Sequence, residues 1–389
     1  MMEWKKHRLG ELALSIQTGP FGSQLHQSDY SECGIPVIMP KDMINGKIVT
    51  NDIARVSDIH VQRLKRHKVK SGDIIYSRRG DVGRCSLITE REEGWLCGTG
   101  CLKVALDKSK CVPSFIAFIL QRKDSIGWVE NHAVGATMPN LNTGILSNLP
   151  LIIPTFEEQG RIASILSAYD NLIENNNKRI RLLEQMAENL YKEWFVRFRF
   201  PGHEKTEFEN GLPKGWSKSP LAEICEFKRG KNITSDQMCE GNIPVISAGI
   251  DVSGYHNKAN VKGVSVTMSS SGANAGYIGI HYTSIWAADC SYIEDSTTQK
   301  IYYVYELLNN LRAVITNFQR GAAQPHVYPK DINRIKLVVP NNELMVEANK
   351  KLAVIHKEIH HLQQQSNLLS RQRDLLLPRL MSGKLEVKV

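Results

Sequence analysis

Two related segments carry the residues best suited to recognise a ligand. The segment SRRGDVG places Arg78 and Arg79 before a glycine, and SSSGANAG at residues 269–276 carries Ser270 and Asn274. Arginine donates paired hydrogen bonds to guanine edges or phosphates, asparagine suits adenine, and serine suits several bases. A glycine lets the backbone come close to a ligand. The pair predicts two modules that read different targets, with a plain surface turn as the alternative for each residue.

A repeat links these segments to a second pair. Residues 134–154 (VGATMPNLNTGILSNLPLIIP) and 320–340 (RGAAQPHVYPKDINRIKLVVP) share a glycine, two prolines and a closing apolar run, at an offset of 186 positions (320 minus 134). Between the shared positions, TMPN changes to AQPH. A duplicated scaffold with exchanged side chains indicates two modules of one kind with different ligands.

The sequence lacks the usual spacings of a catalytic site. It has no glycine-rich phosphate loop, no dinucleotide or S-adenosylmethionine loop, no H-E-x-x-H and no G-x-S-x-G. Cys97 and Cys101 are the only close pair among eight cysteines, and they favour reduced structural thiols over a metal site. The sequence therefore favours a binding protein over an enzyme.

Length and composition are typical of a soluble protein with two domains. The chain has 389 residues, of which 42% are hydrophobic and 23% charged. A net charge of +9 permits contact with phosphates but does not establish it. No apolar run reaches the length of a signal peptide or a membrane span, so we expect a cytoplasmic protein without membrane contact.

Each half ends in a predicted helix. Thr155 and Glu158 form a capping-box pattern, and apolar residues then advance by alternating steps of four and three, as in a coiled-coil seam. About 40 residues at ~1.5 Å each give a rod of roughly 60 Å. Asn176 would fix the register, and two amphipathic helices lying on their own domains are the alternative. The expected interface positions are Ile162, Leu166, Tyr169, Ile173, Asn176, Ile180, Leu183, Leu190, Leu352, Ile355, Ile359, Leu362, Leu369 and Leu376.

The globular segments predict an α+β fold of two mixed α/β domains in tandem, each followed by a long helix. Short runs such as GDIIYSR and IKLVVP predict strands, and residues 114–122 and 303–316 predict helices. Prolines and glycines predict an exposed linker at 198–216. The expected regions are a first domain at 1–154, a central helix and linker start at 155–200, a second domain at 201–340 and a C-terminal helix at 341–389.

These features resemble the specificity subunit of type I restriction–modification enzymes. The resemblance rests most on LPLIIPTFEEQGRIASIL at 149–166 and LLLPRLMSGKLEV at 375–387, while PNNELMVEAN departs from the usual Glu-Gln pair of the second helix entry. It implies two target recognition domains and an antiparallel coiled coil with pseudo-twofold symmetry. It also implies a non-catalytic chain that reads a bipartite, asymmetric DNA target and directs adenine methylation and ATP-dependent cleavage by partner subunits.

The resemblance names partners and cofactors as well. Two methyltransferase subunits and translocase–endonuclease subunits would join this chain on double-stranded DNA. S-adenosylmethionine, ATP and magnesium would be bound by those subunits, and none by this chain. The other readings are a stand-alone DNA methyltransferase or nuclease with unrecognised motifs, and a protein-binding coiled-coil scaffold.

The candidate DNA contacts combine polar loop residues with nearby cations. The base readers would be Arg78, Arg79, Thr137 and Asn140 in the first half, and Ser270, Asn274, Gln324 and His326 in the second. Lys41, Lys228 and Arg229 would contact phosphates.

Overall fold

The chain divides into two compact units, each described here by itself. Unit 1 combines residues 1–172 with 368–389, and unit 2 consists of residues 173–367. The computed structural model describes residues 4–135, 139–321 and 324–385.

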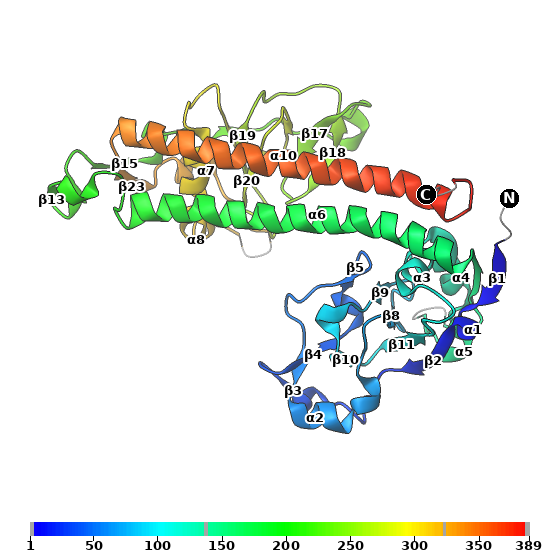
Figure 1. The fold of residues 1–389 in the computed structure, drawn as a ribbon. Helices are drawn as coiled ribbons and strands as arrows, with labels where there is room; N and C mark the ends of the chain where they lie inside the picture. Colours follow the sequence, from blue (N-terminus) through cyan, green and yellow to red (C-terminus); the bar gives the residue numbers. More distant parts are fainter. Residues whose placement is uncertain (1–3, 136–138, 322–323, 386–389) are drawn as a thin grey trace. The chain divides into compact units, whose positions relative to one another are not determined.

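Two small sheets form the centre of unit 1 (Figure 1). The first is antiparallel, and its strand β8 reads IIYS with all four residues buried, as expected of a strand covered on both faces. In the second sheet, β10 runs parallel to β4. The strand order of the first sheet is β2 (Ala13–Thr18), β11 (Cys101–Leu106), β8 (Ile74–Ser77), β9 (Cys85–Leu87). The order of the second sheet is β10 (Leu96–Cys97), β4 (Ile35–Ile38), β7 (Arg55–Val56), β3 (Tyr30–Ser31).

Short helices and two strand pairs complete unit 1. The predicted helix at 114–122 is α3, which spans Pro113–Leu120 and is followed by α4 (Lys123–His132). The other elements are α1 (Leu9–Leu12), α2 (Asp58–Arg63), α5 (Thr143–Ser147), β1 (Lys5–Arg8) paired with β12 (Pro150–Ile153), and β5 (Met43–Ile44) paired with β6 (Lys47–Ile48).

Unit 2 has the corresponding sheets. Helix α7 (Ile301–Asn310) packs on β19 and β20, and a break at Leu311 separates it from α8 (Arg312–Thr316) in the region predicted as one helix. The strand order of one sheet is β16 (Lys228–Arg229), β22 (Cys290–Glu294), β19 (Ser265–Ser269), β20 (Ile278–His281). The order of the other sheet is β18 (Val252–His256), β17 (Ile243–Ile246), β21 (Trp286–Ala287). The remaining elements are α9 (Pro329–Ile332) and the strand pairs β13 (Phe208–Glu209) with β14 (Leu212–Pro213) and β15 (Ser217–Pro220) with β23 (Lys336–Val339).

The two units repeat one another in their backbone hydrogen bonds. The Leu9 amide donates to the Leu149 carbonyl, and the Leu221 amide donates to the Ile335 carbonyl, at 2.9 Å in both cases. Strands β4 and β17 both read IPVI. Each pairs in parallel with a two-residue strand later in the chain, β4 with β10 and β17 with β21. This confirms the predicted α+β fold class with two mixed α/β domains in tandem.

In unit 2 the long helices α6 (Phe156–Tyr191) and α10 (Asn342–Leu380) run side by side in opposite directions (Figure 1). Asn176 Nδ2 donates to Gln365 Oε1 at 2.9 Å, and Arg179 pairs with Glu358 at 2.8 Å. The buried residues of both helices belong to the same core as α7, so helix pairing and packing on the domain occur together.

In unit 1 the beginning of α6 meets the end of α10. Ile162 and Leu166 share one core with Leu380, and Asp170 forms an ion pair with Arg373 at 2.5 Å. Within the two units, none of the expected interface positions is exposed, whereas Leu182, on the other side of α6, is 64% exposed.

The two helix entries use different caps. Thr155 Oγ1 accepts from the Glu158 amide at 3.4 Å, which is one half of the predicted capping box, while the Oε2 atom of Glu158 is shielded from water without a hydrogen-bond partner. Instead, Gln159 is buried, donating to the Pro154 carbonyl and accepting from the Val112 amide. Helix α10 begins on the Asn341 side chain, which accepts from Leu344 at 2.8 Å.

The segment 198–216, expected to be an exposed linker, is partly buried. Phe200 stacks on Trp216 with ring centroids 5.4 Å apart, and both side chains are buried in the core of unit 2. Most residues of the segment are exposed, as predicted, but aromatic burial holds these two rings in the core in spite of the local preference of proline and glycine for exposed turns.

All eight cysteines are free thiols. Six are buried, and Cys33 in unit 1 and Cys239 in unit 2 are exposed. Cys101 and Cys290 occupy equivalent places, because their thiols donate to the Ile38 and Ile246 carbonyls at 3.4 and 3.5 Å.

Candidate nucleic-acid interface

The arginine pair of unit 1 follows strand β8 and is held by its backbone. The Arg78 amide donates to the Gly100 carbonyl, and the Arg78 carbonyl accepts from the Leu141 amide, both at 2.8 Å. Arg79 forms a β-bridge with Asn140, which forms a second bridge with Val134. The fold therefore brings residues 78–80 together with residues 134 and 140–141, which lie about 60 positions later in the sequence.

The serine loop of unit 2 is held in the same way. The Ser270 carbonyl accepts from the Val327 amide at 3.0 Å, and Ser271 forms a β-bridge with His326. His326 forms a second bridge with Arg320, at the place where Asn140 meets Val134 in unit 1. Each partner in the second loop lies 186 positions after its equivalent, so the repeat seen in the sequence is also a repeat of contacts.

The side chains on these equivalent loops differ. Arg79 is exposed and Arg78 half-buried, with its guanidinium carbon 5.7 Å from the centre of the Phe21 ring. By contrast, Ser270 and Ser271 are buried, and Ser271 Oγ donates to Asp289 Oδ2 at 2.7 Å. Unit 1 thus presents cationic donors, whereas unit 2 keeps its serine hydroxyls close to the protein.

The other predicted base readers lie on the same loops. Asn140 and His326 are half-buried, and the Oδ1 atom of Asn140 is shielded from water without a hydrogen-bond partner. Gln324 is exposed, and Asn274 lies in the turn after Ser271, where its carbonyl accepts from the Tyr277 amide. Thr137 lies outside the described residues.

The predicted phosphate contacts are exposed but already have acceptors nearby. Lys41 donates to the Asp52 carbonyl at 2.9 Å, and Lys228 lies 3.3 Å from Glu294. Arg229 lies 4.0 Å from Asp289, the same carboxylate that Ser271 contacts. A phosphate would therefore have to compete with these weak surface interactions.

Two residues of this interface were not found from the sequence. Asp289 joins Ser271 to Arg229, and Phe21 packs beside Arg78. Both lie far from the loops in sequence, so only the fold shows the contact. The one available signal for Phe21 was its position between two glycines.

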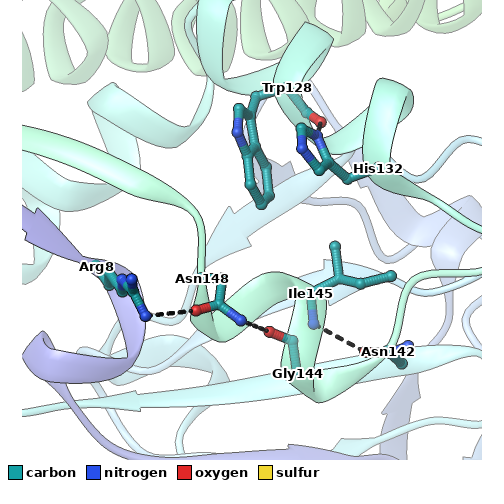
Figure 2. A pocket seen from close by; sticks show the side chains of 7 residues that line it. All are labelled: Arg8, Trp128, His132, Asn142, Gly144, Ile145 and Asn148. Atoms are coloured by element: carbon teal, nitrogen blue, oxygen red, sulfur yellow. Dashed lines mark hydrogen bonds between the residues drawn. The ribbon is translucent and has the colours of Figure 1, made fainter.

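A shallow pocket lies elsewhere in unit 1 (Figure 2). Trp128 and His132 of α4 stack with ring centroids 3.9 Å apart, and Arg8 donates to Asn148 at 3.0 Å. None of the predicted DNA contacts lines it. The lining residues are Arg8, Trp128, His132, Asn142, Gly144, Ile145 and Asn148.

Metal and membrane sites were sought in the part of the chain that the structure describes. No group of three or more His, Cys, Asp or Glu side chains there is placed to hold a metal ion. Nor is any helix in those residues long and apolar enough to cross a bilayer.

Comparison with known proteins gives consistent relatives. A model of the type I restriction modification DNA specificity domain matches residues 1–185 and 213–369. The type I restriction enzyme MjaIX specificity subunit of Methanocaldococcus jannaschii is 24% identical over 381 residues, covering 91% of this chain and 87% of the relative. The HindI specificity subunit of Haemophilus influenzae is 20% identical over 475 residues, covering 99% of this chain and all of the relative.

A solved structure shares the fold. The S subunit of a type I restriction–modification system from M. genitalium aligns with a TM-score of 0.67 at 21% identity, covering 97% of this chain and 96% of that one. Specificity subunits are the non-catalytic, DNA-recognising components of these systems. The family model matches most of the chain in two blocks, one in each half of the repeat. This chain therefore belongs to the type I restriction–modification DNA specificity family.

Proposed function

We propose that this chain reads a bipartite, asymmetric DNA target, with the loops of unit 1 contacting one part and those of unit 2 the other. The observation that carries the proposal is one set of backbone bridges that presents different side chains: Arg79 with Asn140 in unit 1, and Ser271 with His326 in unit 2. Such an arrangement suits recognition, because base edges differ while the phosphate backbone does not.

The chemistry of each loop favours different bases. Arg78 and Arg79 offer guanidinium donors for guanine or phosphate, and Asn140 offers an amide for adenine. His326 and Gln324 supply both donors and acceptors in unit 2. We expect the two parts of the target to differ in sequence for this reason.

The catalytic steps belong to partner subunits in this proposal. Two methyltransferase subunits carry S-adenosylmethionine and methylate adenine, and translocase–endonuclease subunits use ATP and magnesium to cut unmethylated DNA. A duplicated chain suits a partner present in two copies, since each half offers an equivalent surface. The regions 1–154 and 201–340 act as recognition domains, and the paired helices hold them at a fixed spacing.

A domain exchange tests the proposal. Residues 1–154 are replaced by the matching segment of a relative, an exchange that keeps β1 and β12 together. Adenine methylation is then sequenced in cells that also contain the partner subunits. We expect one part of the methylated sequence to change and the other part to stay. An unchanged sequence would contradict DNA reading by this segment.

The matched control exchanges residues 201–340 and should change only the other part of the sequence. Purified chain without partners should neither bind S-adenosylmethionine in calorimetry nor cut DNA. Either activity in the isolated chain would favour a stand-alone enzyme instead.

A further inference from the structure

Phe21 presents a large aromatic ring to solvent from a rigid loop. The ring is 50% exposed, although Gly19 and Pro20 just before it are buried. The Gly19 amide donates to the Cys101 carbonyl at 2.8 Å, and a Cβ atom on Gly19 would lie 2.1 Å from the Gly98 oxygen. After the ring, the Leu25 amide donates to the Phe21 carbonyl, and Leu25 is buried. The loop is thus fixed on both sides of the exposed ring.

Arg78 lies over this ring and has an unsatisfied donor. Its guanidinium carbon is 5.7 Å from the centroid of Phe21, within the range of a cation–π contact. The Arg78 Nε atom is shielded from water and has no hydrogen-bond partner. A base edge cannot reach an atom that water does not reach, so the terminal nitrogens of Arg78 are the donors left for a ligand.

Unit 2 lacks both members of this pair at the equivalent places. The Gly230 amide donates to the Cys290 carbonyl at 2.8 Å, as Gly19 does to Cys101 in unit 1. Phe21 stands two residues after Gly19, and Asn232 stands two residues after Gly230. Ser270 replaces Arg78 on the other loop. The ring is therefore present where the arginine is present, and absent where a serine takes its place.

We propose that Phe21 is a positioning residue that orients the Arg78 guanidinium to read one guanine. The ring lies beside the guanidinium, so that its two terminal nitrogens point together at the O6 and N7 acceptors of a guanine edge. The inference rests on the proposed function, because it assumes that unit 1 contacts DNA. It adds the residue that sets the direction of the contact and the base that is read.

The test uses the full chain assembled with its partner subunits and S-adenosylmethionine. Methylation of a library of duplexes, varied at each position of the unit 1 part of the target, gives the preference for each base. Arg78→Ala should lower the preference for guanine at one position about tenfold. Phe21→Ala should lower it about threefold at the same position.

Further variants separate orientation from bulk. Phe21→Tyr keeps the aromatic face and should retain the preference, whereas Phe21→Leu should behave like Phe21→Ala. The double variant Phe21→Ala/Arg78→Ala should be no worse than Arg78→Ala, since the ring acts only through the arginine. Ile59→Ala, which removes another exposed apolar side chain of unit 1, should leave every preference unchanged.

Several outcomes would overturn the inference. One is an unchanged preference for guanine in Phe21→Ala or in Arg78→Ala. Another is a loss of this preference in the double variant that equals the sum of the two single losses. A third is equally weakened methylation of all sequences, which indicates a phosphate contact. A lower preference for guanine in Phe21→Ala that comes with a lower melting temperature of unit 1 would also count against it. If exchange of residues 1–154 still changes the target, only this inference fails and the proposed function stands.

Discussion

The loop at 78–80 and the loop at 270–272 are held by equivalent backbone hydrogen bonds and yet offer different chemistry. In unit 1 the loop exposes the Arg79 guanidinium, and in unit 2 Ser271 is buried against Asp289. Main-chain hydrogen bonds hold both loops at equivalent places, and the side chains of Arg79 and Ser271 take no part in those bonds. The comparison teaches that the fold is carried by positions other than those that face a ligand, which leaves the latter free to differ.

The largest expected difference lies where the helices meet their units. Glu306 contacts His356 at 3.0 Å in unit 2, with both side chains at most 3% exposed. Asp170, which lies 186 positions before His356, instead pairs with Arg373 at a partly exposed site in unit 1. Glu306→Ala should destabilise unit 2 by about 3 kcal/mol, because it leaves the buried Nε2 atom of His356 without its hydrogen-bond partner, while Nδ1 keeps the Tyr282 hydroxyl. Asp170→Ala should cost unit 1 about 1 kcal/mol or less.

Amide hydrogen exchange measured in urea reports the stability of each unit separately. Glu358→Ala is the matched control, since this carboxylate pairs with Arg179 on the helix surface and its loss should cost little. Similar losses from Glu306→Ala and Asp170→Ala would show that the two polar pairs are equivalent after all.

A second comparison concerns the equivalent glycines. A Cβ atom would lie 2.1 Å from the Gly98 oxygen at Gly19 and 2.4 Å from the Ala288 oxygen at Gly230. Gly19→Ala and Gly230→Ala should each destabilise the protein by about 2–3 kcal/mol, since main-chain atoms must move. Chemical denaturation provides the measurement. Gly22→Ala, with no atom within 4 Å, serves as the control. If either glycine tolerates alanine, the two backbones do not impose the same constraint.

The third comparison is acid sensitivity. Burial, together with Arg66 and Lys103, lowers the pKa of His67 in unit 1 to about 4, and burial lowers the pKa of His281 in unit 2 to about 4. The unfolded chain has an ordinary histidine pKa of about 6.5, so between these two pKa values it binds more protons than the folded chain, and stability falls as the pH is lowered. Each histidine should cost about 1–2 kcal/mol at about pH 5 and nothing above about pH 7.5.

His67→Gln should remove the loss of stability at low pH from unit 1 only, and His281→Gln should remove it from unit 2 only. Hydrogen exchange at about pH 5 and at about pH 7.5 provides the measurement. His26→Gln replaces an exposed histidine of unit 1 and is the control. Acid sensitivity that survives in the substituted unit would point to other groups as its source.

The smallest expected effect concerns the register of the helices. Asn176 is buried in unit 2 and donates to Gln365 across the helix pair. Asn176→Leu should raise the melting temperature slightly, by the equivalent of about 1 kcal/mol or less, because a buried amide costs stability. We also expect the amide hydrogen-exchange rates along α6 and α10 to become less uniform, because the register of the two helices is less firmly fixed. A clear loss of stability would mean that the hydrogen bond is favourable in net terms.

The repeat and the helix seam could be predicted because their signals are local or regular. A period of 3.5 residues places Ile162 and Leu166 on one side of α6, and Ile359 on the corresponding side of α10, without knowledge of the fold. The equivalence of Asn140 and His326 followed from a constant offset. The contacts of Arg78 did not, because the ring beside it lies 57 positions earlier in the chain (78 minus 21).

Other features depend on distant partners for the same reason. Gln159 contributes to the entry to α6, and its second partner is Val112, 47 positions earlier in the chain (159 minus 112). Phe200 is buried in the core of unit 2, where it stacks on Trp216. The burial of Ser270 and Ser271 also comes from packing, which residue type and spacing do not reveal.

The uneven burial of the cysteines gives the protein a pair of natural attachment points. Desolvation raises the pKa of the Cys290 thiol to about 12, and such a thiol is slow to react with electrophiles. Cys33 and Cys239 are the exposed ones, and each unit carries one of them. Maleimide dyes should therefore label one site per unit without any engineered residue. Energy transfer between the dyes would then follow the separation of the two units as DNA is bound.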